Sequence, residues 1–350
     1  MAISVLGIDI GTYAAKVVSL GNIKGNKATL LGLGMAQLPS ELVLNWEDEP
    51  VPAKTAISQA LKNLISKTKL TSTKYISTSV SGDSIVVKKI TMPIMSPAEL
   101  KTAIVGEAEQ YIPFSISEVN LSYHILDTSQ MDNQMTVLLV AARKTIVQNY
   151  MDTLNAVKLK PAVIDVDGLA LCNAYDFVYP GNSDDALLVD IGANMLNIIV
   201  LNRGIPMVIK DEPGGGQYLT TEIGMHFDQT YEDAEAIKFG AEQAPNPGEA
   251  ADLVDRIVAN WIAAVERVMD LARSENATYR PKKILLSGGS SLTPGLTQEF
   301  EKYFNLPTTL FNPLISLNYN SKKFDQSYLN YVGPQMAVSF GLALRKVEVQ

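Results

Sequence analysis

The stretch from Gly7 to Tyr13 constrains the fold of this chain most strongly. It lies between two apolar runs and predicts a strand, a tight turn that carries Asp9 and Gly11, and a returning strand. A glycine in such a turn lets backbone N–H groups approach a phosphate closely. Because Asp9 would repel a bare phosphate, we expect a Mg²⁺ ion between the two. Taken alone, the stretch also fits an ordinary β-hairpin.

A second copy of this pattern occurs in the middle of the chain. Asp190 and Gly192 follow Asp9 and Gly11 at a constant offset of 181 residues, and apolar residues of the returning strand coincide at the same offset without a gap. Two such turns half a chain apart predict a duplicated fold whose turns face each other across a cleft. The repeat therefore favours nucleotide binding between two lobes over two unrelated hairpins.

The composition indicates a well-packed globular chain and argues against several functions. With 350 residues, 47% hydrophobic and 19% charged, the chain is expected to form two domains or one large bilobed unit. A net charge of -8 without a Lys/Arg cluster argues against nucleic-acid binding. The single cysteine, Cys172, excludes an internal disulfide framework. Because no apolar run approaches about 20 residues, we expect a cytoplasmic protein without direct membrane insertion.

The segment 74–159 predicts a separate β-rich unit. Its first two runs, 74–80 and 84–91, alternate in strand fashion around a Ser-Gly-Asp turn, which predicts that they pair. Ser96 and Glu99 form a capping-box start for a helix. We expect strands at 119–127 and 135–142 and a helix at 144–157 to complete the unit.

Two glycine-rich segments precede helix starts in the second half of the chain. Gly214, Gly215 and Gly216 come directly before a predicted helix, where backbone N–H groups can bind an anion, although a flexible connector fits the same pattern. Gly288 and Gly289 follow a buried strand and lead into another helix start.

The two Asp-x-Gly hairpins and the Gly-Gly-Ser-Ser-Leu-Thr-Pro-Gly turn at 288–295 resemble the actin-like ATPase superfamily of actin, FtsA, MreB, sugar kinases and DnaK-type chaperones. In particular, the chain resembles the PilM family of type IV pilus assembly proteins. The similarity extends over nearly the whole chain. It rests on the segments 81–84 with 87–90, 107–114 (Glu-Ala-Glu-Gln-Tyr-Ile-Pro-Phe), 118–121 and 341–345.

The resemblance implies an α/β, bilobed actin-like ATPase fold, built from duplicated ribonuclease-H-like domains with an inserted subdomain of the FtsA/PilM type. The expected units are the first-lobe core 1–73, the inserted subdomain 74–159, the first-lobe return and connecting helix 160–184, the second-lobe phosphate hairpin 185–204, the lower second-lobe subdomain 205–280, and the second-lobe core with the adenosine loop and C-terminal helix 281–350.

The resemblance also implies a site for ATP or ADP with Mg²⁺. Asp9 and Asp190 are expected to hold the metal through water, and Lys16 to contact phosphate. The full set of expected nucleotide-binding residues is Asp9, Gly11, Thr12, Tyr13 and Lys16 in the first loop, Asp190, Gly192 and Asn194 in the second, Gly214, Gly215, Gly216, Thr220, Glu235 and Lys238 in the lower second lobe, and Gly288, Gly289 and Ser290 in the adenosine loop.

Hydrolysis is the open point of this comparison. The superfamily usually presents Gln or Glu to orient the attacking water, whereas here Asp167 matches that position and Asp165 lies nearby. Asp is one methylene shorter and reaches less far toward a water molecule. The two residues also fit a helix cap on the surface. We therefore expect an ATP-loaded scaffold with slow or no hydrolysis, and assign Asp167 as the candidate catalytic residue.

PilM-like proteins bind the cytoplasmic N-terminus of PilN, an inner-membrane protein, in a groove beside the inserted subdomain. The resemblance therefore implies a PilN-like partner, together with other pilus platform and motor proteins. An extended peptide would add to an edge strand or fill alternate pockets there. Because no amphipathic C-terminal membrane helix follows residue 345, recruitment to the inner membrane would depend on a partner.

Two other functions on the same fold remain open. A small-molecule kinase would need its own general base between the lobes, and the two histidines, His124 and His226, do not lie in a motif for one. Turnover that depends on a small acceptor would favour the kinase. A filament-forming ATPase like FtsA or MreB is the other alternative, which sedimentation of the ATP-loaded protein would reveal.

Overall fold

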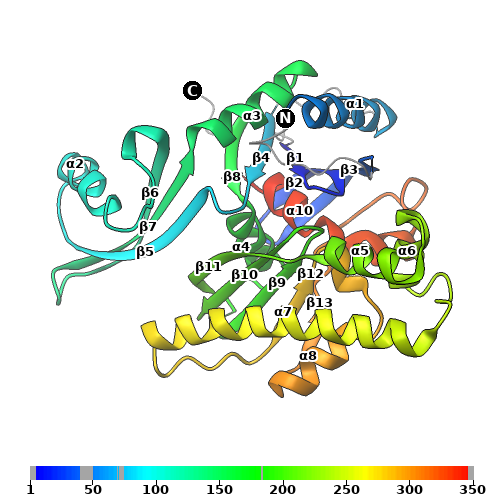
Figure 1. Cartoon of the computed structure of the whole chain (residues 1–350). Coiled ribbons are helices and arrows are strands. Elements are labelled where there is room, and N and C mark those ends of the chain that lie inside the picture. Colours follow the sequence, from blue (N-terminus) through cyan, green and yellow to red (C-terminus); the bar gives the residue numbers. More distant parts are fainter. Residues whose placement is uncertain (1–4, 40–49, 69, 71–74, 183, 346–350) are drawn as a thin grey trace.

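Three β-sheets organise the chain. The computed structural model describes residues 5–39, 50–68, 70, 75–182 and 184–345. Two five-stranded sheets form the body, and a three-stranded sheet stands to one side of them (Figure 1). We call them the first, second and third sheets in chain order. Residues 1–4 and 346–350, at the ends of the first and last expected units, lie outside the described part.

The first sheet has the strand order β3-β2-β1-β4-β8, in which β1 to β3 are antiparallel neighbours and β4 and β8 add in parallel. Helices α1 and α3 pack on one face, and α4 and α10 pack on the other. The bounds are β1 Val5–Ile10, β2 Ala14–Lys24, β3 Lys27–Gln37, α1 Pro50–Thr68, β4 Tyr75–Val80, α3 Lys144–Ala156, β8 Pro161–Val166, α4 Asp167–Val178 and α10 Ala337–Ala343.

The second sheet repeats this topology with the order β11-β10-β9-β12-β13. One of its faces shares the core around α4 and α10 with the first sheet, and the other is covered by α5, α7 and α8. Figure 1 shows α7 running along the outside of this sheet. The bounds are β9 Ala186–Ile191, β10 Met195–Asn202, β11 Ile205–Pro213, α5 Gly216–Phe227, α6 Tyr231–Lys238, α7 Pro247–Glu275, β12 Ile284–Ser287, α8 Leu296–Phe304, β13 Thr308–Leu310 and α9 Gln326–Val332.

The predicted repeat of the hairpin is confirmed residue by residue. Strands β1 and β9 begin and end at the 181-residue offset, and both are buried along their whole length. Each turn closes in the same way: the Gly11 N–H donates to the Ala14 carbonyl at 3.2 Å, and the Gly192 N–H to the Met195 carbonyl at 2.9 Å. The two turns therefore present equivalent residues to the space between the sheets.

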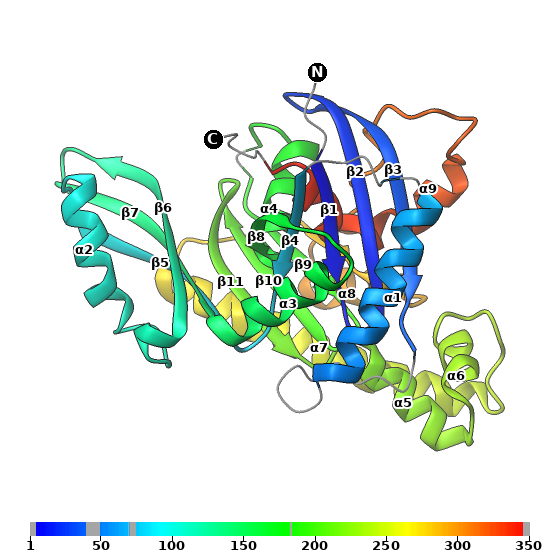
Figure 2. The same ribbon diagram turned by 90° about the horizontal axis from the view of Figure 1, so that it is seen from above.

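The third sheet has the order β5-β7-β6 and is covered by α2. The predicted capping box of α2 is present, with the Ser96 side chain bonded to the Glu99 N–H and the Glu99 carboxylate to the Ser96 N–H. Figure 2 shows the third sheet beside the body from a second direction. The bounds are β5 Ile85–Pro93, α2 Pro97–Ala108, β6 Val119–Ser129 and β7 Gln134–Arg143.

The predicted pairing of 74–80 with 84–91 is wrong. Strand β4 pairs in parallel with β1 and β8 inside the first sheet, whereas β5 pairs with β7 in the third sheet. The reason lies in burial: five of the six residues of β4 are buried, as expected for a strand covered on both faces. The Ser-Gly-Asp segment therefore connects the first sheet to the third sheet. Residue 74 lies outside the described part.

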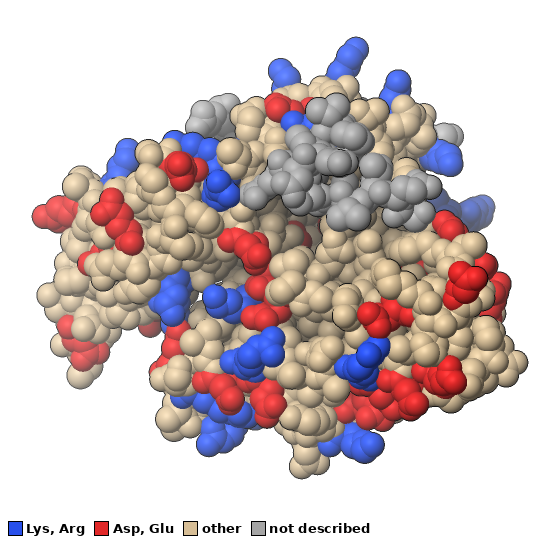
Figure 3. Space-filling model, viewed as in Figure 1, with Lys and Arg blue, Asp and Glu red and all other residues tan. Residues whose placement is uncertain are grey.

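Three short 3₁₀ segments complete the described structure. One of them, Gly333–Met336, leads directly into α10. The other two are Ile116–Glu118 and Gly289–Leu292. Acidic and basic side chains are interspersed over the face shown in Figure 3. In the described residues, no helix is both long and apolar enough to cross a membrane.

Candidate functional site

A cavity of about 500 Å³ lies where the two hairpin turns approach each other, between the first and second sheets. Helix α4 contributes to its floor, and α6 and the 289–292 segment form the far wall. The structure brings most of the expected site residues together here. Those that line the cavity are Asp9, Gly11, Thr12, Tyr13, Lys16, Asp167, Asp190, Gly192, Asn194, Glu235, Lys238, Gly289 and Ser290.

The other expected residues lie behind the cavity wall and shape it. Gly216 packs so closely on Ser290 that a Cβ would lie 1.8 Å from the serine Oγ. Gly288 has a positive φ of 85°, and a Cβ there would lie 2.4 Å from the Ile191 carbonyl oxygen. Both positions therefore require glycine for close packing. Gly214 and Gly215 donate backbone hydrogen bonds to Asn194, and Thr220 is buried beneath Lys238.

Asp9 and Lys16 form an ion pair inside the cavity. They are direct cross-strand neighbours on β1 and β2, and the Lys16 Nζ lies 2.9 Å from Asp9 Oδ2. Burial alone would lower the pKa of Lys16, but the neighbouring Asp9 carboxylate, aided by Asp190 and Asp167, raises it. Lys16 therefore stays protonated and offers a fixed positive charge to the cavity.

Asp190 is the equivalent carboxylate of the second hairpin, and its surroundings differ. It accepts a hydrogen bond from Ser287 Oγ at 2.7 Å, and its cross-strand neighbour is Asn197 instead of a lysine. Burial raises the pKa of Asp190 to about 6, although Lys16 and Ser287 oppose this shift. Asp190 is therefore less readily ionised than a carboxyl group in water.

Asp167 is the first residue of α4 and points into the same cavity, whereas Asp165 does not line it. Burial, followed by the charge of Asp9, raises the pKa of Asp167 to about 7. Asp165 instead forms an ion pair with Arg345 at 3.1 Å. The structure thus separates the two candidates: Asp167 faces the cavity as a partly protonated carboxyl group, and Asp165 pairs with Arg345 away from it.

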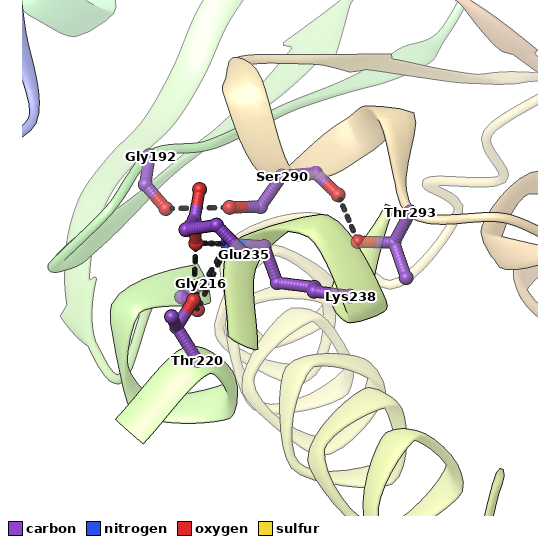
Figure 4. Close-up of polar contacts among 7 residues, drawn as sticks. All are labelled: Gly192, Gly216, Thr220, Glu235, Lys238, Ser290 and Thr293. Atoms are coloured by element: carbon purple, nitrogen blue, oxygen red, sulfur yellow. Dashed lines mark hydrogen bonds and ion pairs between the residues drawn. The ribbon is translucent and has the colours of Figure 1, made fainter. Parts of the chain in front are cut away.

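A network of polar contacts forms the far wall (Figure 4). Lys238 Nζ donates to Thr220 Oγ1 at 2.9 Å and to the Gly216 carbonyl at 3.3 Å, and it pairs with Glu235, which also accepts from Thr220. Burial lowers the pKa of Lys238, although Glu235 opposes this. Ser290 Oγ donates to the Gly192 carbonyl at 3.2 Å and ties this wall to the second hairpin.

Several cavity residues were not expected from the sequence. Tyr231 and Tyr331 line the cavity together with the expected Tyr13. Burial, followed by the charge of Glu235, raises the pKa of Tyr13 to about 12 and also raises that of Tyr231. Asn197 lies at the 181-residue offset from Lys16, so the repeat could have identified it. The repeat does not identify Tyr231 or Tyr331 in this way.

The carboxylates do not form a direct metal cage. Among the residues that the structure describes, no three His, Cys, Asp or Glu side chains are close enough together to ligate one ion. The arrangement is instead a polar cavity with Lys16 and Lys238, several carboxyl groups and glycines at its turns. Such a site suits an anionic ligand that brings its own hydrated cation.

Comparison with known proteins places this geometry in a family. A family model for type IV pilus assembly protein PilM matches residues 7–347. The chain belongs to the PilM family. A solved structure described as a PilM-PilN type IV pilus biogenesis complex is 27% identical in sequence, with a TM-score of 0.84 and coverage of 99% of each chain.

More distant similarities agree with the PilM family and confirm the actin-like fold. The cell division protein FtsA of Neisseria meningitidis serogroup B is 26% identical, over 86% of this chain and 81% of FtsA. The structure of MreB 5 of Spiroplasma citri bound to AMPPNP has 11% identity and a TM-score of 0.52, covering 97% of this chain and 94% of that one. The bilobed α/β fold implied by the sequence is therefore confirmed.

Proposed function

We propose that this PilM-family protein is an ATP-binding scaffold of the inner-membrane platform that assembles type IV pili or a related secretion apparatus. In this proposal it binds the cytoplasmic N-terminal segment of a PilN-like membrane protein and is held at the inner membrane by that partner. Other platform and motor proteins would contact it there. The observation that carries the proposal is the cavity between two repeated Asp-x-Gly hairpins in a chain that matches a PilM-PilN complex along 99% of its length.

The residues of the cavity fit a magnesium nucleotide. Asp9 and Asp190 enter it from opposite hairpins and would hold the hydrated ion, which neutralises phosphate charge when bound. Lys16 would contact a phosphate oxygen directly. A Cβ at Gly11 would lie 3.8 Å from Lys16 Nζ and 3.9 Å from Asp9 Oδ1, so a side chain there would fill the space in front of both groups.

The far wall would bind the nucleoside. Glu235 can accept hydrogen bonds from ribose hydroxyls, and Lys238 fixes the position of that carboxylate. Gly289 leaves open space for a base, because a Cβ there would have its nearest neighbour, Gln335 Oε1, only at 3.8 Å. Gly288 and Ser290 hold this surface against the second hairpin. MreB 5 of Spiroplasma citri, which shares the fold, was solved with AMPPNP.

The length of the Asp167 side chain supports slow hydrolysis. Asp167 lines the cavity, but its side chain is one methylene shorter than the Glu or Gln that usually orients the attacking water, so it reaches less far toward that water. Its pKa, raised to about 7 by burial, leaves a fraction of the molecules with an ionised carboxylate at neutral pH. We propose that Asp167 sets a slow ATPase rate and that the nucleotide-bound state acts mainly as a binding platform.

Calorimetry on natively purified protein tests the proposal. The bound nucleotide is first identified by chromatography; Mg²⁺-ATP and a PilN-type N-terminal peptide are then titrated, the peptide with and without nucleotide. We expect both to bind, and Asp190→Ala to weaken Mg²⁺-ATP binding by about 100-fold, or about 2.7 kcal/mol. Asp270→Ala, which removes an exposed carboxylate on α7, is the matched control. Wild-type protein that binds neither ligand would overturn the proposal.

A further inference from the structure

The chain enters and leaves the third sheet through a stem of two neighbouring crossings. The chain leaves the first sheet after Val80 and returns to the body at Lys144, where α3 begins. The two crossings lie side by side, because the Arg143 N–H donates to the Ser84 carbonyl at 3.1 Å and Ile85 pairs with Ala142. Figures 1 and 2 both show the third sheet projecting to one side of the body. A stem of this kind is a natural hinge.

A residue of the second sheet holds the stem. Gly82, in the outgoing crossing, has a φ of 101° and donates its N–H to Asp211 Oδ2 at 2.6 Å. Asp211 lies on β11, 129 positions further along the chain. This charge-assisted bond therefore joins the hinge of the third sheet to the second sheet.

The other carboxylate oxygen of Asp211 bonds to a residue that lines the cavity. Asp211 Oδ1 accepts a hydrogen bond from Asn197 Nδ2 at 2.8 Å, and Asn197 lines the cavity. Asn197 is also the cross-strand neighbour of Asp190. Ser81, which precedes Gly82 in the stem, lines the cavity as well. One carboxylate thus contacts a cavity residue with one oxygen and the hinge with the other.

We propose that Asp211 couples occupancy of the cavity to the orientation of the third sheet. A phosphate oxygen in the cavity would compete with Asp211 for the Asn197 amide and would repel the Asp211 carboxylate, so nucleotide binding loosens the contact with Gly82. By linkage, a partner that stabilises the released third sheet tightens nucleotide binding by the same factor. This inference rests on the proposed nucleotide site and defines its regulation.

A second contact across the same boundary supplies a control. Lys88 on β5 forms an ion pair with Glu275 on α7 at 2.8 Å. Neither residue lines the cavity. If Asp211 acts by connecting the cavity to the hinge, loss of the Lys88 pair leaves the response to nucleotide intact.

The experiment measures the distance between two spin labels. The labels are attached through Met131→Cys and Gln298→Cys. Met131 lies in the exposed turn between β6 and β7 of the third sheet, and Gln298 lies on the exposed face of α8, which covers the second sheet. Both are introduced into the full chain with Cys172→Ala, which removes the native thiol. Distances are recorded with and without Mg²⁺ and AMPPNP, and calorimetry on the same samples reports nucleotide affinity.

Three variants separate coupling from simple support of the fold. Asp211→Ala removes both acceptors. The double variant Asn197→Asp with Asp211→Asn exchanges donor and acceptor, so the new amide at position 211 can donate to position 197 and still accept from Gly82. Lys88→Gln removes only the outer ion pair.

We expect nucleotide to shift the label distance in the labelled parent and in Lys88→Gln. Asp211→Ala should show the shifted distance already without nucleotide and bind nucleotide about fivefold more tightly, because binding no longer breaks the contact. The exchanged pair should keep the nucleotide-free distance in both conditions. A parent protein that binds nucleotide without a shift, or an Asp211→Ala protein that behaves like it, would overturn the coupling and leave the proposed function standing. A parent protein that binds no nucleotide would overturn both.

Discussion

The two repeated hairpins have the same backbone and different electrostatics. In the first, Asp9 faces Lys16 across the strand pair, and the two form an ion pair at 2.9 Å. In the second, the equivalent partners are Asp190 and Asn197, and the amide turns away to bind Asp211 at 2.8 Å. Asp190 is left with the Ser287 hydroxyl.

This difference assigns separate roles to the two halves of a duplicated fold. The first hairpin contains its own cation, because Lys16 pairs directly with Asp9. The second hairpin contains a carboxylate that burial makes reluctant to ionise, and it directs its cross-strand side chain toward β11. The two turns share their backbone hydrogen bond, and the difference between Lys16 and Asn197 changes the electrostatic surroundings of their carboxylates.

The largest expected effect comes from removing the charge of the first carboxylate. Asp9→Asn leaves Lys16 without its ion-pair partner in a largely enclosed site, and breaking such a pair from one side costs about 3 kcal/mol of unfolding free energy. Urea denaturation at pH 7.5 without nucleotide measures it. The control is the double variant Asp9→Asn with Lys16→Met, which removes both charges and should recover most of the loss. No recovery would show that Asp9 stabilises the fold by other means.

The second prediction concerns Asp167, the carboxyl group that α4 places in the cavity. The pKa of Asp167 is raised from 3.8 to about 7, so between these pH values the folded state binds more protons than the unfolded state. The free energy of unfolding therefore falls as pH rises through this range. Because the side chain is only partly buried, we expect Asp167→Asn to stabilise the nucleotide-free protein by about 2 kcal/mol at pH 8.

Denaturation of wild type and Asp167→Asn at pH 5 and pH 8 checks this sign. The difference between the two proteins should be small at pH 5, where Asp167 is protonated in the folded state, and large at pH 8. The same variant should lose the slow ATPase activity. Equal stabilisation at both pH values would indicate a packing effect instead of a charge effect.

The hairpins and most of their cavity residues could be predicted because their signals are local. An Asp, a Gly and flanking apolar runs at a fixed offset describe each turn completely, and the backbone bonds at Gly11 and Gly192 follow from that pattern. The carboxylates and glycines of the cavity could therefore be predicted from residues a few positions apart in the sequence. Lys16 and Asn197 also occupy equivalent places in the repeat, so the asymmetry between the hairpins was present in the sequence as well.

Contacts between distant segments could not be predicted in this way. Strand β4 pairs with β1 and β8 instead of β5, and this choice depends on which faces become buried in the finished fold. The bond between Gly82 and Asp211 joins residues from two sheets and has no local signature. Tyr231 and Tyr331 likewise reach the cavity only through the placement of α6 and α9.

The third prediction tests the second carboxylate directly. The pKa of Asp190 is raised from 3.8 to about 6 by burial, so its ionised form destabilises the nucleotide-free protein above that pH. Asp190→Asn should therefore raise the unfolding free energy by about 1.5 kcal/mol at pH 8, opposite in sign to Asp9→Asn. Urea denaturation measures the stability of both variants in parallel. Destabilisation by Asp190→Asn would contradict the proposed difference between the hairpins.

The smallest expected effect belongs to Ser287, which supports the second carboxylate in place of a lysine. Ser287→Ala removes a hydrogen bond of 2.7 Å to buried Asp190 and should cost about 1 kcal/mol at pH 8. Loss of this donor should also raise the pKa of Asp190 further, so the cost should shrink near pH 5, where the carboxyl group is protonated. Ser291→Ala, whose hydroxyl bonds only to the Gly288 carbonyl, is a control whose cost should not change with pH. If both variants show the same pH dependence, Ser287 does not act through the charge of Asp190, and the second hairpin would need another source for the stability of its ionised carboxylate.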